Sequence, residues 1–171
     1  MRELILDFNL DWVDIAVKIF LPLTITFIVA GIIGLERQNV GKAAGVSSHI
    51  LVAMGSAGIA IMQRLMFEYH LSLGLDVDGQ RIIAQVVTGI GFVGAGVIIK
   101  DQSSDTIKGI TTAATIWSTA MVGLILGSCY ILVGTIIGLF LVIFVLARDF
   151  TRGFNPFKPP VHGEREAEDH H

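Results

Sequence analysis

The stretch RIIAQVVTGIGFVGAGVIIK, Arg81–Lys100, decides how this chain folds. Eighteen uncharged residues lie between its two basic ends. At about 1.5 Å per residue, a helix of that length nearly crosses the ~30 Å hydrocarbon core of a bilayer. The run also contains Gln85, Thr88 and four glycines. Glycine weakens a helix in water but lets neighbouring helices approach closely in a membrane. We therefore predict that this segment is the central, protein-packed helix of a membrane bundle.

The composition supports an integral membrane protein. Of the 171 residues, 53% are hydrophobic and 16% are charged, whereas soluble domains carry about 25% charged residues. The length allows one compact bundle and no second large domain. A net charge of −3 gives no indication of nucleic-acid binding. Because Cys129 is the single cysteine, an intrachain disulfide and a cysteine-based metal cluster are excluded.

We predict an all-α, polytopic bundle of five transmembrane helices with glycine-rich packing. The spans are expected near residues 13–35, 46–62, 81–100, 107–126 and 130–147, with a long loop at 63–81 and a polar turn at 100–108. Residues 1–18 are interpreted as an amphipathic lead-in, or as an outward extension of the first helix. Residues 19–147 form the bundle, and 148–171 a disordered cytoplasmic tail whose closing histidines could be a purification-tag remnant.

An odd number of spans places the two termini on opposite sides of the membrane. If the C-terminus is inside, eight lysines and arginines lie inside and four lie outside. Since cytoplasmic loops carry the excess of basic residues, the count favours an outside N-terminus and a cytoplasmic C-terminus.

The first candidate site lies at the end of the first span. It combines Glu36, Arg37, Gln38 and Lys42, with Lys108 expected on the same side of the membrane. Buried charges need partners, so Glu36 and Arg37 are expected to pair. The functional interpretation is an inner-face site for an anionic group, a lipid headgroup or a partner protein. The alternative is a positive-inside signal whose long side chains extend to the headgroups.

The second candidate site is the polar stripe of Arg81, Gln85 and Thr88. The spacing i, i+4, i+7 places these residues on one helix face, which is expected to meet protein or a water-filled cavity. The alternative is hydrogen bonding between helices without further function. Asp78 lies one turn earlier, where it is predicted to cap the helix and to neutralise Arg81.

The third candidate site is a polar side of the fourth span, with Thr111, Thr112 and Trp117. Threonine hydroxyls can also bond the preceding turn of their own helix, which requires no function.

His49 is interpreted as structural, because no second metal ligand is near it in sequence. The apolar runs of the second to fifth spans contain no acidic residue, so a magnesium site within the membrane is poorly supported. No catalytic motif is present, and neither enzymatic activity nor a cofactor is expected.

Several motifs together resemble the MgtC/SapB family of bacterial membrane proteins. They are GLERQ at 34–38, GKAAG at 41–45, Arg81 leading into VVTGIGFVGAGVI at 86–98, and KGITTAAT at 108–115 followed by Trp117. The resemblance implies a five-helix inner-membrane protein linked to growth in low magnesium. It also implies action on a partner, the proton-translocating ATP synthase in virulence-associated members. Longer members carry a soluble C-terminal domain, so this chain resembles a short form.

Three functional hypotheses follow. The first is a regulator of magnesium homeostasis that contacts a membrane partner through glycine-rich helix faces and inner-side charges. The second is a transporter or channel for Mg²⁺ or another small ion, with Arg81, Gln85 and Thr88 lining the path. The third is a structural homodimer built on the third and fifth spans, where Gly134 and Gly138 form a GxxxG spacing. Expected partners are membrane lipids, a second copy of the chain or another membrane complex, and not nucleic acid.

Overall fold

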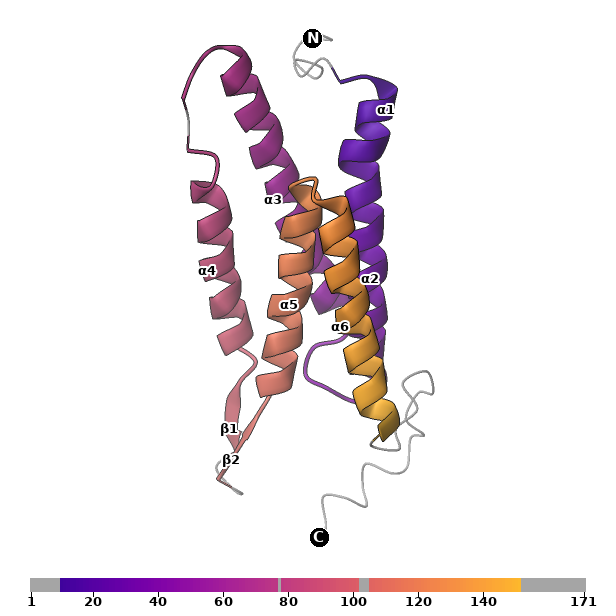
Figure 1. The fold of residues 1–171 in the computed structure, drawn as a ribbon. Coiled ribbons are helices and arrows are strands. Elements are labelled where there is room, and N and C mark those ends of the chain that lie inside the picture. Colours follow the sequence, from indigo (N-terminus) through magenta and orange to yellow (C-terminus); the bar gives the residue numbers. More distant parts are fainter. Residues whose placement is uncertain (1–9, 77, 102–104, 152–171) are drawn as a thin grey trace.

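The structure, a computed structural model, describes residues 10–76, 78–101 and 105–151 (Figure 1). The first helical run comprises α1 (Trp12–Ile15), the π-helical η2 (Ala16–Phe20) and α2 (Leu21–Asn39). It is followed by α3 (Val46–Ser72), α4 (Arg81–Ala95), β1 (Ile99–Asp101), β2 (Thr106–Lys108), α5 (Ile110–Gly127) and α6 (Ile131–Thr151). The predicted all-α bundle is confirmed, with a small β-hairpin added between α4 and α5.

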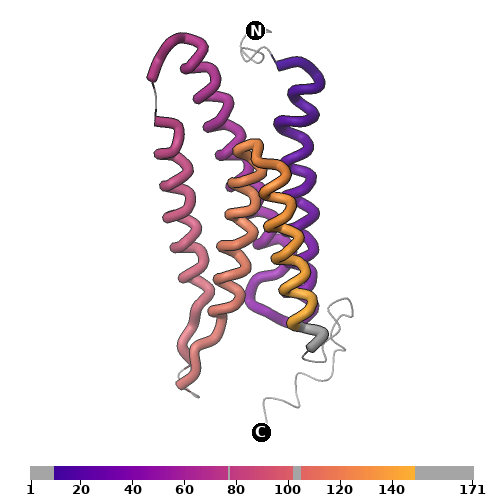
Figure 2. Tube along the Cα trace, in the orientation of Figure 1, coloured from indigo at the N-terminus to yellow at the C-terminus, as the bar shows by residue number. Residues whose placement is uncertain are grey.

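The helices alternate in direction, so the described chain begins and ends at opposite ends of the bundle (Figure 2). The α2–α3 loop, the β1–β2 hairpin and the last turns of α6 lie at one end, here called the hairpin end. The α3–α4 loop and the α5–α6 turn lie toward the other end, here called the N-terminal end. Arg37 and Lys108 therefore share the hairpin end, as the five-segment topology requires.

Four of the described helical stretches are long and apolar enough to cross a membrane. They are Trp12–Asn39, Val46–Ser72, Ile110–Gly127 and Ile131–Arg148, whereas α4 is a shorter apolar helix of 15 residues. The predicted third span was therefore too long. Its last two residues, Ile99 and Lys100, belong with Asp101 to a strand that pairs antiparallel with residues 106–108, and this hairpin replaces the predicted polar turn.

Two other predicted boundaries were wrong. Helix α3 continues to Ser72, through half of the predicted loop at 63–81, and stops before Gly74, whose φ of +72° suits a residue just past a helix end. Helix α6 continues to Thr151, beyond the predicted start of the tail. Residues 12–18 extend the first span, which is the second of the two interpretations given for the lead-in. Residues 1–9 of the lead-in and the rest of the predicted tail lie outside the described residues.

The central helix is α5, not α4. Helix α5 packs against α2, α3, α4 and α6, whereas α4 buries only Ile90 and Gly94 among its 15 residues. The prediction failed because the number of glycines does not indicate which of them meets another backbone. In α4, a methyl group added at Gly89 or Gly91 would contact nothing within 4 Å.

The closest helix contact is a seam of small residues between α3 and α5. A Cβ built on Gly123 would lie 2.3 Å from the carbonyl oxygen of Ala53, and one on Gly127 would lie 2.4 Å from that of Ala57. The side chains of Ala53, Ala57 and Ala60 are fully buried. Residues spaced four apart on each helix thus bring the two backbones together, which is the small-xxx-small arrangement of membrane helices.

The GxxxG pair of α6 also packs inside the bundle. A Cβ on Gly134 would lie 2.6 Å from Cγ of Leu126, and one on Gly138 would lie 3.0 Å from Cγ2 of Val29. These glycines seat α6 against α5 and α2. They do not present an outer surface in the single chain, so this pair is not available there for the part of the homodimer contact that the third hypothesis assigns to it.

Candidate functional site

A buried ion-pair cluster joins α2 to α6 near the hairpin end. Glu36 and Arg37 are each 1% exposed, and the Nε and Nη2 groups of Arg37 donate to the two carboxylate oxygens of Glu36. The Nη2 of Arg148 on α6 donates to Oε1 of Glu36 over 3.4 Å. The predicted pairing of Glu36 with Arg37 is present, and the carboxylate is shared with a second arginine that the sequence reasoning missed. A bidentate arginine–carboxylate contact fixes the relative orientation of the two groups in addition to pairing their charges.

The other predicted members of this site do not join the cluster. Oε1 of Gln38 accepts from the backbone N–H of Val46 over 3.4 Å, so Gln38 holds the α2–α3 loop. Lys42 is exposed. Lys108 is also exposed and forms an ion pair of 2.9 Å with Asp101 across the hairpin. The hairpin end therefore has a buried charge cluster and a separate set of exposed lysines.

His49 connects α3 to α5. It is fully buried, its Nδ1 lies 2.8 Å from the carbonyl oxygen of Gly45, and its Nε2 lies 3.1 Å from Oγ1 of Thr115. A carbonyl can only accept, so Nδ1 carries a proton. The Thr115 hydroxyl also lies 2.9 Å from the carbonyl of Thr112. Because a hydroxyl has one proton, Thr115 can donate to Thr112 or to His49, but not to both.

The predicted polar side of α5 divides into two. Thr112 is buried with Thr115 and Thr119 in the bundle, whereas Thr111 and Trp117 are exposed. The hydroxyl of Thr119 bonds the carbonyl oxygen of Thr115 over 2.9 Å. Hydrogen bonding within the helix, the alternative that the sequence left open, accounts for this threonine. Thr115 has the additional link to His49.

The polar stripe of α4 faces away from the bundle. Arg81, Gln85 and Thr88 are all exposed, and the Thr88 hydroxyl bonds the carbonyl oxygen of Ala84 over 3.1 Å. In the single chain this stripe therefore does not line an interior path. Asp78 was predicted to cap α4 directly, but the N-cap is Gln80, and Oδ1 of Asp78 accepts from the Gln80 backbone N–H over 3.0 Å.

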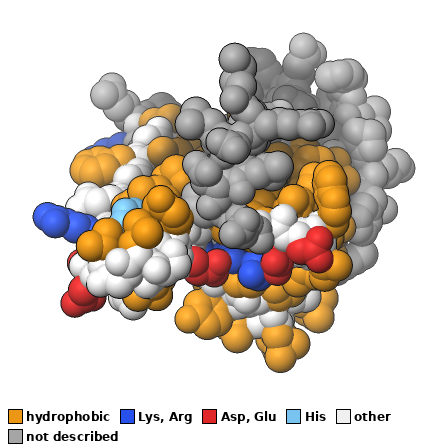
Figure 3. Space-filling view, turned by 90° about the horizontal axis from the view of Figure 1, so that it is seen from above, with side chains coloured by type: hydrophobic (Ala, Val, Ile, Leu, Met, Phe, Trp, Pro, Cys, Tyr) orange, Lys and Arg blue, Asp and Glu red, His pale blue; other side chains and the backbone are white. Residues whose placement is uncertain are grey.

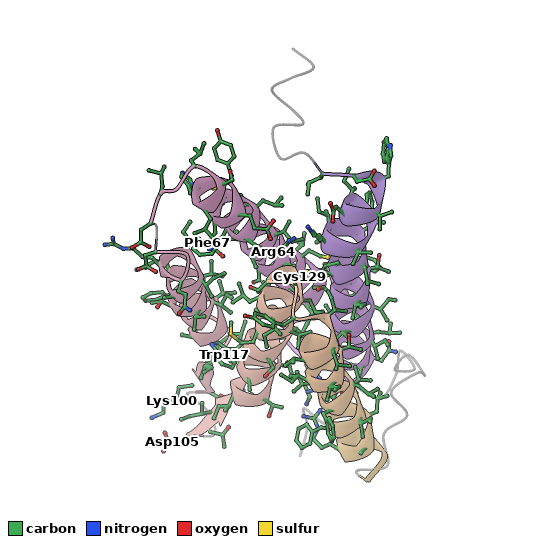
Figure 4. The ribbon with its side chains drawn as sticks, turned by 45° about the horizontal axis from the view of Figure 1, so that its top comes forward. Arg64, Phe67, Lys100, Asp105, Trp117 and Cys129 are labelled. Carbon is green, nitrogen blue, oxygen red and sulfur yellow. The ribbon has the colours of Figure 1, made fainter. Side chains whose placement is uncertain are left out.

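Arg64 is a partly buried connector at the N-terminal end that the sequence reasoning missed. Its Nη2 donates to the carbonyl oxygen of Lys18 over 2.8 Å, and its Nε donates to that of Gly127 over 3.4 Å. In an α-helix the Lys18 carbonyl would accept from residue 22, but Pro22 has no N–H to donate. The chain forms the π-helical turn η2 there, and Arg64 supplies the missing donor. Figure 4 shows Arg64 on α3.

Further charges surround Arg64 at this end of the bundle. Arg64 pairs with Glu68 over 3.3 Å, and Lys18 pairs with Asp14 over 3.0 Å. Seen from the N-terminal end, acidic and basic side chains meet between hydrophobic ones (Figure 3). A cavity of about 700 Å³ lies beside Arg64, and its lining includes Phe67, Asp78 and Tyr130. Among the described residues, no group of three or more His, Cys, Asp or Glu could hold a metal ion.

Comparison with known proteins shows which family the chain resembles. The profile of the MgtC family matches residues 23–153. A protein of Escherichia coli K12 named "Putative magnesium transporter YhiD" is 45% identical over 113 residues, which cover 65% of this chain and 51% of that protein. "Protein MgtC" of Brucella abortus strain 2308 is 38% identical over 102 residues, covering 60% of this chain and 39% of that protein.

A cyanobacterial relative matches over a similar length. "Protein SrpB" of Synechococcus elongatus is 36% identical over 123 residues, covering 68% of this chain and 65% of that protein. The chain thus spans from 39% to 65% of the length of these three relatives. No solved structure matches the chain.

Proposed function

The chain belongs to the MgtC family of multi-pass membrane proteins, and on that premise we propose that it serves magnesium homeostasis by regulating a membrane partner. The proposed location is the bacterial inner membrane, with the N-terminus outside and the hairpin end in the cytoplasm. The excess of lysine and arginine expected at the hairpin end supports this orientation.

The closed α3–α5 seam is the observation that favours regulation over transport. Gly123 and Gly127 bring α5 so close to α3 that an added methyl group would overlap the carbonyl oxygens of Ala53 and Ala57. Magnesium gives up its water reluctantly and needs room for a hydrated ion. The seam has no such room, and the polar stripe of α4 lies outside the bundle. The centre of this chain is therefore built for packing.

The hairpin end offers the surface on which a partner would be contacted. Lys100 and Lys108 are 66% and 71% exposed, and Lys42 on the adjoining loop is also exposed. Lys100 pairs with Asp105 over 2.6 Å near the hairpin tip (Figure 4). In the proposed orientation these charges face the cytoplasm, where they would meet a partner's acidic groups.

Flux measurement in sealed liposomes tests the regulatory proposal. With the purified chain as the only protein, Mg²⁺ entry should equal that of empty liposomes, while a strain lacking the gene should grow poorly in low magnesium until the gene is restored. Cross-linked membranes should yield a co-purifying complex, and the proton-translocating ATP synthase is the first to be probed. Mg²⁺ entry that depends on the chain would overturn regulation in favour of transport.

Transport remains the second candidate, supported by the name of the Escherichia coli relative. In that case the path would have to form between copies or between the chain and another protein, because the polar residues of α4 face outward.

Cysteine labelling tests the orientation that both candidates share. Lys42→Cys should react with an impermeant reagent only after the cytoplasmic face is opened, and Glu68→Cys should react from outside.

A further inference from the structure

The outer face of α4, defined here by Arg81, Gln85, Thr88 and Phe92, is polar where a lone membrane helix should be apolar. At about 100° per residue these four positions fall within a sector of about 60°. The two buried residues of α4, Ile90 and Gly94, lie on the opposite side. Phe92 is 77% exposed, and the three polar residues are exposed as well. Helix α4 thus packs by one side and presents the other to its surroundings.

Lipid is a poor environment for this face. No described residue forms a hydrogen bond with the Gln85 side chain, whereas Thr88 satisfies its own hydroxyl on Ala84. Gln85 lies about 6 Å along the helix axis from Arg81, the first residue of α4. The amide is therefore one turn further into the membrane than the arginine. Hydrocarbon supplies no hydrogen-bonding partner, and polar groups on membrane helices therefore face protein or water.

We propose that the outer face of α4 is the contact surface for a second copy of this chain. Two copies inserted in the same direction are related by a two-fold axis along the membrane normal, so each residue meets its own counterpart at equal depth. A glutamine amide both donates and accepts, so two Gln85 side chains bond each other reciprocally. Arg81 lies at the start of α4, where its long side chain can extend to the headgroups rather than meet its counterpart on the second copy.

The shape of α4 also allows this approach. Gly89 flanks the outer face, and a Cβ added there would contact nothing within 4 Å in the single chain. Glycine beside a polar residue is the arrangement by which membrane helices approach and hydrogen-bond. The inference stands on α4 alone and does not depend on the proposed role in magnesium homeostasis.

Disulfide cross-linking tests the contact in the full chain. In a Cys129→Ser background, Gln85→Cys should form a disulfide between copies when membranes are oxidised, because equal residues face each other. Ile136→Cys is the matched control, since Ile136 is 46% exposed on α6 and lies at a similar distance from the start of its helix. It should remain monomeric. Failure of Gln85→Cys to cross-link, or equal cross-linking at both sites, would overturn the assignment.

Dissociation provides an independent readout. Gln85 is exposed in the single chain, so Gln85→Leu should leave the unfolding midpoint of the monomer unchanged while weakening dimerisation about tenfold, the loss expected for two hydrogen bonds between membrane helices. Unchanged dimerisation of Gln85→Leu would overturn the role of the amide. Capture of a different protein by a photo-cross-linker at position 85, with no adduct to a second copy, would also overturn it.

Discussion

Adding one methyl group at Gly123 should strongly destabilise the bundle. In Gly123→Ala the new Cβ would lie 2.3 Å from the carbonyl oxygen of Ala53, about 1 Å closer than ordinary contact. That oxygen belongs to the α3 backbone, so α3 and α5 must separate. A gap of about 1 Å forfeits up to half of the dispersion energy of the facing atoms. Overpacking in cores costs roughly 1–3 kcal/mol, and we expect the upper part of that range, because Ala53 and Ala57 are fully buried.

The matched control for this prediction is Gly58→Ala on α3. A methyl group there meets nothing within 4 Å, and alanine exceeds glycine in helix propensity by up to about 1 kcal/mol. Gly58→Ala should therefore be neutral or stabilising. The measurement is the unfolding of both variants in mixed detergent micelles, followed by tryptophan fluorescence. If Gly123→Ala is as stable as Gly58→Ala, the seam does not determine the packing of α3 against α5.

Two further predictions concern the buried charges, and the same unfolding assay measures both. Glu36→Gln should cost about 3–5 kcal/mol, because it leaves two arginines near a site without a carboxylate, whereas Arg148→Met should cost less because the pair on α2 persists; equal costs would contradict the shared acceptor. Arg64→Met should cost about 1–3 kcal/mol by leaving the Lys18 carbonyl without a donor. Pro22→Ala restores an N–H to that carbonyl, so the cost of Arg64→Met should fall in the Pro22→Ala background, and strict additivity would refute this account.

Long apolar runs made most of the fold predictable from the sequence. Each predicted span corresponds to a helix, since a segment that crosses a bilayer must satisfy its own backbone hydrogen bonds. The hairpin at 99–108 and the ten extra residues of α3 were missed because they follow local turn and capping chemistry. The central position of α5 was missed for a different reason. Gly89 and Gly123 look alike in sequence, and only the structure shows that Gly123 meets a backbone.

The same limit applies to the candidate site. The Glu36–Arg37 pair was predictable because the two residues are adjacent at the end of an apolar run. The contacts that tie the bundle together join residues 46, 63, 66 and 112 positions apart: Arg64 with Lys18, Arg64 with Gly127, His49 with Thr115, and Arg148 with Glu36. One sequence contains no information on which distant partners meet. It does show that a buried arginine requires an acceptor.

The distribution of these contacts indicates which part of the chain can respond to a partner. Arg64 fixes η2, α3 and α5 at the N-terminal end, the Glu36 cluster fixes α2 and α6 near the hairpin end, and the glycine seam closes the middle. Helix α4 has none of these three connections and buries two residues. Because so little packing energy holds it, a contact on its outer face can shift α4 without unfolding the remaining helices. The β1–β2 hairpin follows α4 directly, so such a shift would reach the exposed lysines at the hairpin end.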